Sequence, residues 1–442
     1  MLQSGSIRLL TNLMKEDFVH YNHTDPCSHA RWTARECYQF MYQRPWKPVA
    51  DLYFDLLNGN LSLSSLFRAE RPLFIEKPSE DDHEVVHTSE ECKLNSKDRT
   101  GRWKRATFKI VLSYHGASFD GWQKQPGLNT VQGLVEKSLG AFIDDRKLKQ
   151  LQEKSLPIEG CALVAGRTDK GVTALNQVCS FYTWREDVKN EEIEEAINRA
   201  APGHIRVISV SKVSREFHPN FSAKWRRYFY IFPVSNGEEV QNNDEGTKSD
   251  IFGSCRENNE VKQQFDGEIV EGNSFSYVHD EGYDTGRTKP RSFDVSRVNQ
   301  LLQQLEGKTL SYKMFARDTK ASRSTGPPTE CFVYHARAAE AMLPSNKGHF
   351  SSHVSPAEVE VIVPQTRVMC VELIANRFLR KMVRVLVATS IREAAAGAED
   401  DALLKLMEAT CRRATAPPAP PEGLCLFDVG YGEFSPEICL IP

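Results

Sequence analysis

The chain has 442 residues, of which 40% are hydrophobic and 10% aromatic, and its formal net charge is −3. This length favours two to three domains with a sizeable core. The charge excludes nucleic-acid binding through bulk positive charge, but not through local basic clusters. The eleven cysteines are scattered without a CxxC pair, which is typical of reduced intracellular thiols. No apolar run reaches the roughly 18 residues that predict a transmembrane helix, so we expect no membrane association.

The first 104 residues are interpreted as an N-terminal extension that is partly disordered. Two aromatic clusters in it, CYQFMYQRPW and DLYFDLL, indicate one or two helices, and residues 76–100 are polar and acidic like a linker. The start of the chain is too polar for a secretory signal and a weak candidate for a transit peptide. We therefore expect an intracellular protein of the cytoplasm or nucleus, with an organelle as the alternative.

Histidines and cysteines gather in this extension and raise the question of a zinc site. Their spacings match no common zinc-ligand pattern, and we expect no metal there. The residues concerned are His20, His23, Cys27, His29 and Cys37.

Regular patterning begins at Ala106 and predicts a first half over residues 105–216. Residues 106–116 alternate apolar and polar positions, as a strand does. Thr130 can cap a helix whose apolar positions recur through Phe142. The segments CALVAG and QVCSFYTW predict two strands around the loop GRTDKGVTA, EEIEEAINRAAP an amphipathic helix, and HIRVISVSKVS another strand. Alternating strands and helices indicate an α/β or α+β layer.

A second half is predicted over residues 217–442. It begins with the strand KWRRYFYIFPV, which is followed by an acidic, aperiodic insertion at about residues 235–290. Asp294 can cap the next helix, with Gly307 at its C-terminal cap. Further strands are expected in CFVYHARAAEAML, EVEVIVPQ, RVMCVELIA and GLCLFDVGYG, and a helix from about Arg377 to Ala396. Two rounds of strands backed by helices predict two similar halves.

Asp169 is the first candidate for chemistry, because it lies in a short loop between two predicted strands. One interpretation is a turn residue, since Asp favours turns and TDKG suits one. The other is a positioned nucleophile or base, with Arg167 two residues before it to hold a phosphate or a carboxylate.

Two further candidates lie in basic segments. Tyr228 shares a predicted strand face with Arg226, and an aromatic face beside a cation suits a nucleobase platform; the alternative is an ordinary core strand. Arg384 is spaced four residues from Arg380 and seven from Arg377, which predicts that the three share one helix face. The alternative for Arg384 is a solvated surface charge.

Together, five motifs in order resemble the TruA-type tRNA pseudouridine synthases. They are LSYHGASFDGWQKQPGLNTVQGLVEKSL, AGRTDKGVTALNQVCSF, FHPNFSAKWRRYFYIF, ANRFLRKMVRVLV and EGLCLFDV. The resemblance covers about residues 106–235 and 290–432. It implies an α+β fold of two α/β halves (RRM-like), a continuous, mainly antiparallel sheet and a central RNA-binding cleft. It also implies tRNA as the partner, isomerisation of uridine in the anticodon stem-loop at about positions 38 to 40, and a homodimer.

The resemblance also implies a role for each matched residue. Asp169 corresponds to the catalytic aspartate, which attacks the uridine at the ribose or removes a sugar proton. The glycosidic bond then breaks, the uracil rotates and a C–C bond forms, without a cofactor. Arg167 is implied to hold the flipped nucleotide or fill its place, Tyr228 to stack on the target uracil, and Arg384 to pair with the aspartate. Leu424 is implied to line the pocket for the base.

Three positions depart from the family pattern. Thr173 stands where the family usually has His, and Asn176 and Ala388 stand where many members have Gly. The catalytic positions are intact, so we expect activity. The alternatives are an inactive RNA-binding homologue, a synthase that acts on other RNA, and an α+β enzyme in which Asp169 activates a different substrate.

Overall fold

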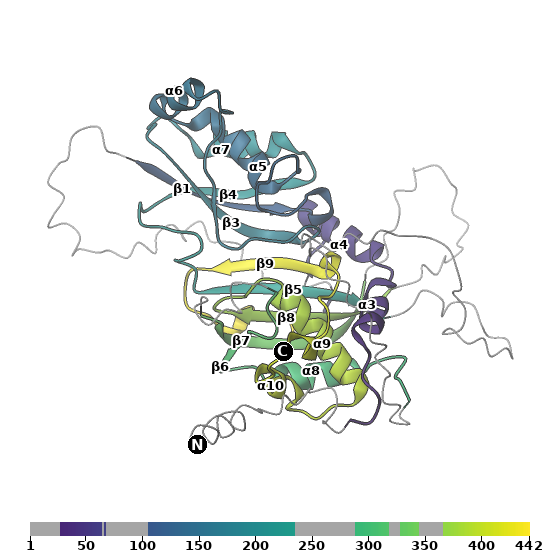
Figure 1. Cartoon of the computed structure of the whole chain (residues 1–442). Helices are drawn as coiled ribbons and strands as arrows, with labels where there is room; N and C mark the ends of the chain where they lie inside the picture. The colour runs from purple at the N-terminus through teal and green to yellow at the C-terminus, as the bar shows by residue number, and fades with distance from the viewer. Residues whose placement is uncertain (1–26, 64–65, 68–104, 235–287, 318–327, 344–365) are drawn as a thin grey trace, which may run out of the picture.

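The computed structural model of the protein describes residues 27–63, 66–67, 105–234, 288–317, 328–343 and 366–442 (Figure 1). Its centre is a nine-stranded sheet with the order β4-β1-β3-β9-β5-β8-β7-β6, and β2 pairs with β3. The pairing is antiparallel except between β3 and β9, which are parallel. The expected mixed fold with one large, mainly antiparallel sheet is confirmed. The strands are β1 Ala106–Tyr114, β2 Leu163–Val164, β3 Thr173–Thr183, β4 Ile205–Val213, β5 Trp225–Pro233, β6 Lys308–Ser311, β7 Glu330–Met342, β8 Arg367–Ala375 and β9 Leu424–Gly430.

The strand β9, the last in the chain, lies in the middle of the sheet between β3 and β5 (Figure 1). Its first residues pair in parallel with the start of β3, through Thr173 with Cys425 and Ala174 with Leu426. On the other side, Leu426 is opposite Tyr228 of β5. The strand therefore joins the group β1–β4 to the group β5–β8.

Helices cover both faces of this sheet. One continuous core contains apolar residues of α5, α7, α8, α9 and α10 together with alternate residues of the strands, whereas α4 packs on the opposite face against Phe229, Ile231 and Cys370. Because both faces are covered, every residue of β5 is buried. The helices are α3 Ala34–Tyr42, α4 Lys47–Asn58, α5 Val131–Leu139, α6 Asp145–Glu153, α7 Asn190–Ala200, α8 Val295–Gln303, α9 Met382–Ala396 and α10 Ala402–Met407.

The two aromatic clusters of the N-terminal extension form α3 and α4, as expected, and both helices pack on the core. Arg31, just before α3, forms an ion pair of 2.8 Å with Glu393 of α9. In α4, the buried Tyr53 donates a hydrogen bond of 2.7 Å to the carbonyl of Gly423, next to the start of β9. Residues 27–63 therefore contact both the longest helix of the core and its central strand.

Several sequence-based boundaries need correction. The helix expected from Arg377 begins only at Met382, because Lys381 before it adopts a left-handed backbone conformation with φ of 59°. The helix α8 ends at Gln303, so Gly307, although it has a φ of 69°, is not its cap. The strand in CALVAG is only β2, and Phe142 lies in a 3-10 turn beyond α5. The expected strand EVEVIVPQ and nearly all of the expected insertion lie outside the described residues.

Substituting Tyr53 by Phe tests how firmly α4 is joined to the core. The change removes the donor to the buried Gly423 carbonyl while keeping the ring, and we expect it to lower the free energy of unfolding by about 1 to 3 kcal/mol. Urea denaturation measures this difference. Tyr38→Phe is the control, since the Tyr38 ring is 48% exposed and its loss of a hydroxyl should change stability by less than about 0.5 kcal/mol. Equal midpoints for the two variants would contradict the prediction.

Candidate active site

The loop between β2 and β3 is held by hydrogen bonds from three other segments. The Thr168 hydroxyl lies 2.7 Å from the hydroxyl of the buried Tyr114 of β1. The Gln177 side-chain amide donates to that same Tyr114 oxygen and, at 2.7 Å, to the carbonyl of Gly166. The backbone N–H of Trp122 donates to the carbonyl of Thr168. Because the residues just before it are tied down, the position of Asp169 is set by the core and not by the loop alone.

Close backbone contact fixes the second half of this loop. A Cβ atom on Gly116 would lie 2.4 Å from the carbonyl oxygen of Gly171, so only glycine allows this approach. Gly171 itself has a left-handed φ of 82°. The Thr173 hydroxyl accepts a hydrogen bond of 3.0 Å from the Gly116 N–H. Thr173, one of the three residues that depart from the family pattern, therefore helps to hold the end of β1 against the loop.

Asp169 forms an ion pair with Arg384, which comes from the first turn of α9. The distance from Arg384 Nη1 to Asp169 Oδ2 is 3.1 Å, and the side chains are 8% and 29% exposed, respectively. Arg384 Nε also donates to the carbonyl of Ala419 at 2.6 Å, which orients the guanidinium. Arg384 is therefore not a solvated surface charge. The prediction that it shares a helix face with Arg377 and Arg380 is wrong, because these two precede α9.

Tyr228 lies on β5 beside the same loop. Its ring packs edge-on against Phe378 at a centroid distance of 5.0 Å, and its hydroxyl lies 3.7 Å from the point that a Cβ on Gly166 would occupy. Burial raises the pKa of Tyr228 to about 12, with a further increase from the charge of Asp169 and an opposing effect of Arg226. The tyrosine is therefore a neutral hydroxyl near neutral pH.

Arg226 is not free to bind a ligand, contrary to the interpretation of this strand face as a cation beside aromatic rings. Its guanidinium donates to the carbonyl of Asn376 at 2.7 Å, to the carbonyl and side-chain oxygen of Asn220 at 2.7 Å each, and to the carbonyl of Ala165 at 3.3 Å. Burial lowers the pKa of Arg226. It thus joins three segments around Tyr228. Sequence reasoning missed this role, because every residue has a backbone carbonyl and the sequence does not show which of them accept a hydrogen bond.

The other two candidate residues lie nearby in different surroundings. Arg167 is exposed on the loop, two residues before Asp169. Leu424 is buried at the start of β9, opposite Tyr230 in register. The structure therefore groups Asp169 with Arg384 and Tyr228, with Arg167 facing solvent and Leu424 on the adjacent strand.

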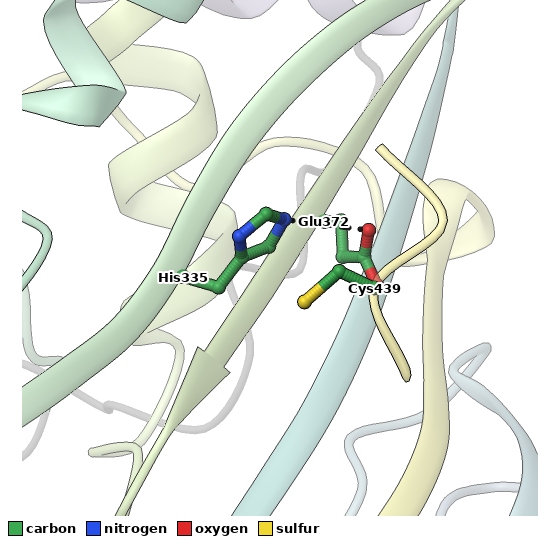
Figure 2. A group of neighbouring side chains, drawn as sticks. All are labelled: His335, Glu372 and Cys439. Carbon is green, nitrogen blue, oxygen red and sulfur yellow. Dashed lines mark ion pairs between the residues drawn. The ribbon is translucent and has the colours of Figure 1, made fainter. Parts of the chain in front are cut away.

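A second cluster of chemistry-bearing side chains comprises His335, Glu372 and Cys439, shown in Figure 2. Their potential ligand atoms lie within 4.8 Å of one another. The cluster lies on the sheet face opposite Tyr228, since Glu372 pairs with Arg227, the neighbour of Tyr228 along β5. Glu372 accepts from Arg227 Nε at 2.7 Å and from the N–H groups of Leu440 and Ile441.

These contacts favour an anchor for the C-terminal segment over a metal centre. The Glu372 carboxylate is already neutralised by a buried arginine. Burial, and next the charge of Glu372, raises the pKa of the Cys439 thiol to about 11, whereas a metal ligand must be a thiolate. Two of the histidines in the N-terminal extension that raised the question of a zinc site, His20 and His23, lie outside the described residues.

Across the described ranges, each helix is too short or too polar to span a bilayer.

Comparison with known proteins gives a consistent family. Residues 332–432 match a family model described as tRNA pseudouridine synthase. The tRNA pseudouridine synthase A of Solibacter usitatus is 37% identical over 122 residues, which are 28% of this chain and 45% of that protein. The protein of the same name from Dictyoglomus thermophilum is 40% identical over 135 residues, 30% of this chain and 48% of that protein.

A third relative matches over a longer range. The tRNA pseudouridine synthase A of Chlorobaculum tepidum is 29% identical over 328 residues, 74% of this chain and 98% of that protein. The chain thus spans about half the length of the first two relatives and nearly all of the third. The resemblance to the TruA-type family, noted from five motifs, is confirmed.

Substituting Gly116 by Ala tests whether backbone contact holds the Asp169 loop in place. The added Cβ would collide with the Gly171 carbonyl, and we expect the free energy of unfolding to fall by about 1 to 3 kcal/mol, as in other overpacked sites. Urea denaturation gives the value. Gly432→Ala is the matched control, because a Cβ there meets nothing within 4 Å. A Gly116→Ala protein as stable as this control would show that the contact does not constrain the loop.

Proposed function

We propose that this chain is a tRNA pseudouridine synthase that isomerises uridine in the anticodon stem-loop, at about positions 38 to 40, without a cofactor. The observation that carries the proposal is the pair between Asp169 and Arg384, held at 3.1 Å, on a loop fixed by hydrogen bonds before Asp169 and by the close approach of Gly116 to Gly171 after it. The names of the relatives support the same substrate class and reaction.

In the proposed reaction Asp169 attacks the target uridine, either at the ribose or by removing a sugar proton. A carboxylate can be a nucleophile when it is positioned and its charge is balanced. Arg384 supplies that positioning, because its guanidinium is itself oriented by the Ala419 carbonyl. The glycosidic C–N bond breaks, the uracil rotates and a C–C bond forms, so that no atom is gained or lost.

The target base must leave its stack before Asp169 can reach it. Arg167 is exposed two residues from Asp169, where it can hold the flipped nucleotide or fill the vacated space. Tyr228, neutral and oriented by Phe378, offers a ring against the uracil and a hydroxyl that can give up or receive a proton. Leu424 supplies an apolar contact from β9. A homodimer and two RRM-like halves around an RNA cleft remain proposals from the family resemblance.

An inactive RNA-binding homologue is the main alternative. It is disfavoured by the intact pair of Asp169 and Arg384, since a protein that only binds RNA has no need for a carboxylate held by a buried arginine. A synthase for other RNA would use the same residues and differ only in its substrate. Synthesis assays with tRNA and with other structured RNA separate these cases.

The variant Asp169→Ala tests the role of the carboxylate. We expect it to bind unmodified tRNA with nearly the affinity of the wild type but to lose on the order of 10⁴-fold or more in single-turnover rate, as for other essential nucleophiles. Chemical mapping of pseudouridine on each tRNA measures rate and position together.

Asp169→Asn and Asp187→Asn complete this design. The first keeps the shape of the side chain but not its charge and should be as inactive as Asp169→Ala. The second removes an exposed carboxylate that is paired with Arg185, and it should behave like the wild type. If the wild-type protein makes no pseudouridine on any tRNA, the proposed function is wrong.

The pH dependence of the reaction tests the state of Tyr228. With its pKa raised to about 12, the hydroxyl stays protonated below that value and loses its proton only as the pH rises through it. The ratio of single-turnover rates of wild type and Tyr228→Phe should therefore be constant between about pH 7 and 10, below the range in which such a tyrosine titrates. An inflection of that ratio within this range would show that the phenolate takes part.

A further inference from the structure

Phe221, in the turn between β4 and β5, is the most exposed large hydrophobic residue in the described part of the chain, at 82%. Exposed apolar residues that occur singly are common, so exposure alone does not define a site. The surroundings of Phe221 distinguish it, because hydrogen bonds fix the backbone of its turn and Arg226 joins that turn to the candidate active site.

Four hydrogen bonds hold the turn. The imidazole Nδ1 of His218 accepts from the N–H groups of Asn220 and Phe221, both at 3.2 Å. The N–H of Ser222 donates to the His218 carbonyl at 2.9 Å, and the His218 N–H donates to the Ser222 hydroxyl at 3.1 Å. The rings of His218 and Phe221 lie 4.3 Å apart with an interplanar angle of 36°. One side of the phenyl ring is thus supported while most of its surface faces solvent.

Arg226 connects this turn to the catalytic loop. Its Nη2 atom donates both to the Asn220 carbonyl, next to Phe221, and to the carbonyl of Ala165, which precedes the segment Gly166–Asp169. Tyr228 follows two residues later on the same strand face. The buried Pro219 is held separately, because its carbonyl accepts from the Tyr431 hydroxyl at 2.9 Å. The turn that carries Phe221 is therefore held close to the segment that leads into the Asp169 loop.

We propose that Phe221, supported by His218, stacks against a nucleobase that flanks the target uridine; this inference rests on the proposed function. Removing a base from its stack leaves its neighbours without a partner, and an aromatic side chain can replace that partner. The exposed residues close to Phe221 in the chain include Asn220 and Lys224. Cationic and polar neighbours suit a phosphate-bearing strand, whereas an apolar protein partner would require a wider hydrophobic patch.

The experiment uses the full chain, Phe221 variants and tRNA transcripts with 2-aminopurine on either side of the target position. We expect Phe221→Ala to weaken binding about 5- to 150-fold, the range of one base–aromatic stack, and to raise KM with little change in kcat. The quenching of 2-aminopurine on binding should be lost at one flanking position. Phe221→Trp should stay within about threefold of the wild type, and Phe221→Leu should resemble Phe221→Ala because it keeps an apolar side chain without a π face.

Controls separate stacking from folding and from the reaction. The melting temperature of Phe221→Ala should equal that of the wild type, since the ring is exposed. Tyr182→Ala removes another exposed aromatic ring near the far end of β3, nine residues from Thr173 and so about 30 Å along the strand, and it should bind normally. Wild-type affinity in Phe221→Ala, or full recovery by Leu, would overturn the inference. If the wild type forms no pseudouridine, the proposed function is wrong. The tRNA-binding affinity and the 2-aminopurine quenching would still show whether Phe221 stacks on a base.

Discussion

The position of β9 is the constraint on which the rest of the architecture depends. Without this strand, β3 and β5 would each present an unpaired edge in the middle of the sheet, and such edges are unfavourable. Its parallel pairing with β3 is short and lies directly after the Asp169 loop, and its antiparallel pairing brings Tyr228 opposite Leu426. The candidate active site therefore lies where the two groups of strands meet, next to a central strand that comes from late in the sequence.

Two buried arginines at this junction, Arg226 and Arg384, have different hydrogen-bond partners and different roles. Arg226 has its guanidinium occupied by backbone carbonyls and one asparagine side chain, so it organises segments and does not present a charge to a substrate. Arg384 is oriented by the Ala419 carbonyl and donates from Nη1 to Asp169. A buried cation without acceptors would be costly, and both arginines have acceptors, whereas Arg167 is exposed on the loop.

The sequence predicted the elements better than their junctions. The strands β1, β4, β5, β7, β8 and β9 and the caps by Thr130 and Asp294 followed from apolar periodicity and cap chemistry, which are local properties. The start of α9 did not, because a left-handed Lys381 interrupts a segment that looks helical in composition. The family resemblance grouped Asp169 with Tyr228 and Arg384, but nothing in the residue pattern indicated the role of Arg226. Its partners are backbone carbonyls distant in the chain, and these depend on tertiary structure alone.

The N-terminal extension contributes to the surroundings of the candidate active site. The helix α3 packs against α9, and Arg31 joins the same helix through Glu393. Tyr42, at the end of α3, has its pKa raised by burial, and Arg384 is the strongest opposing influence on it. The surroundings of the arginine that holds Asp169 therefore include a side chain from this extension. Because interiors are close-packed and transmit small displacements, the seating of α3 on α9 helps to define the position of the Arg384 guanidinium.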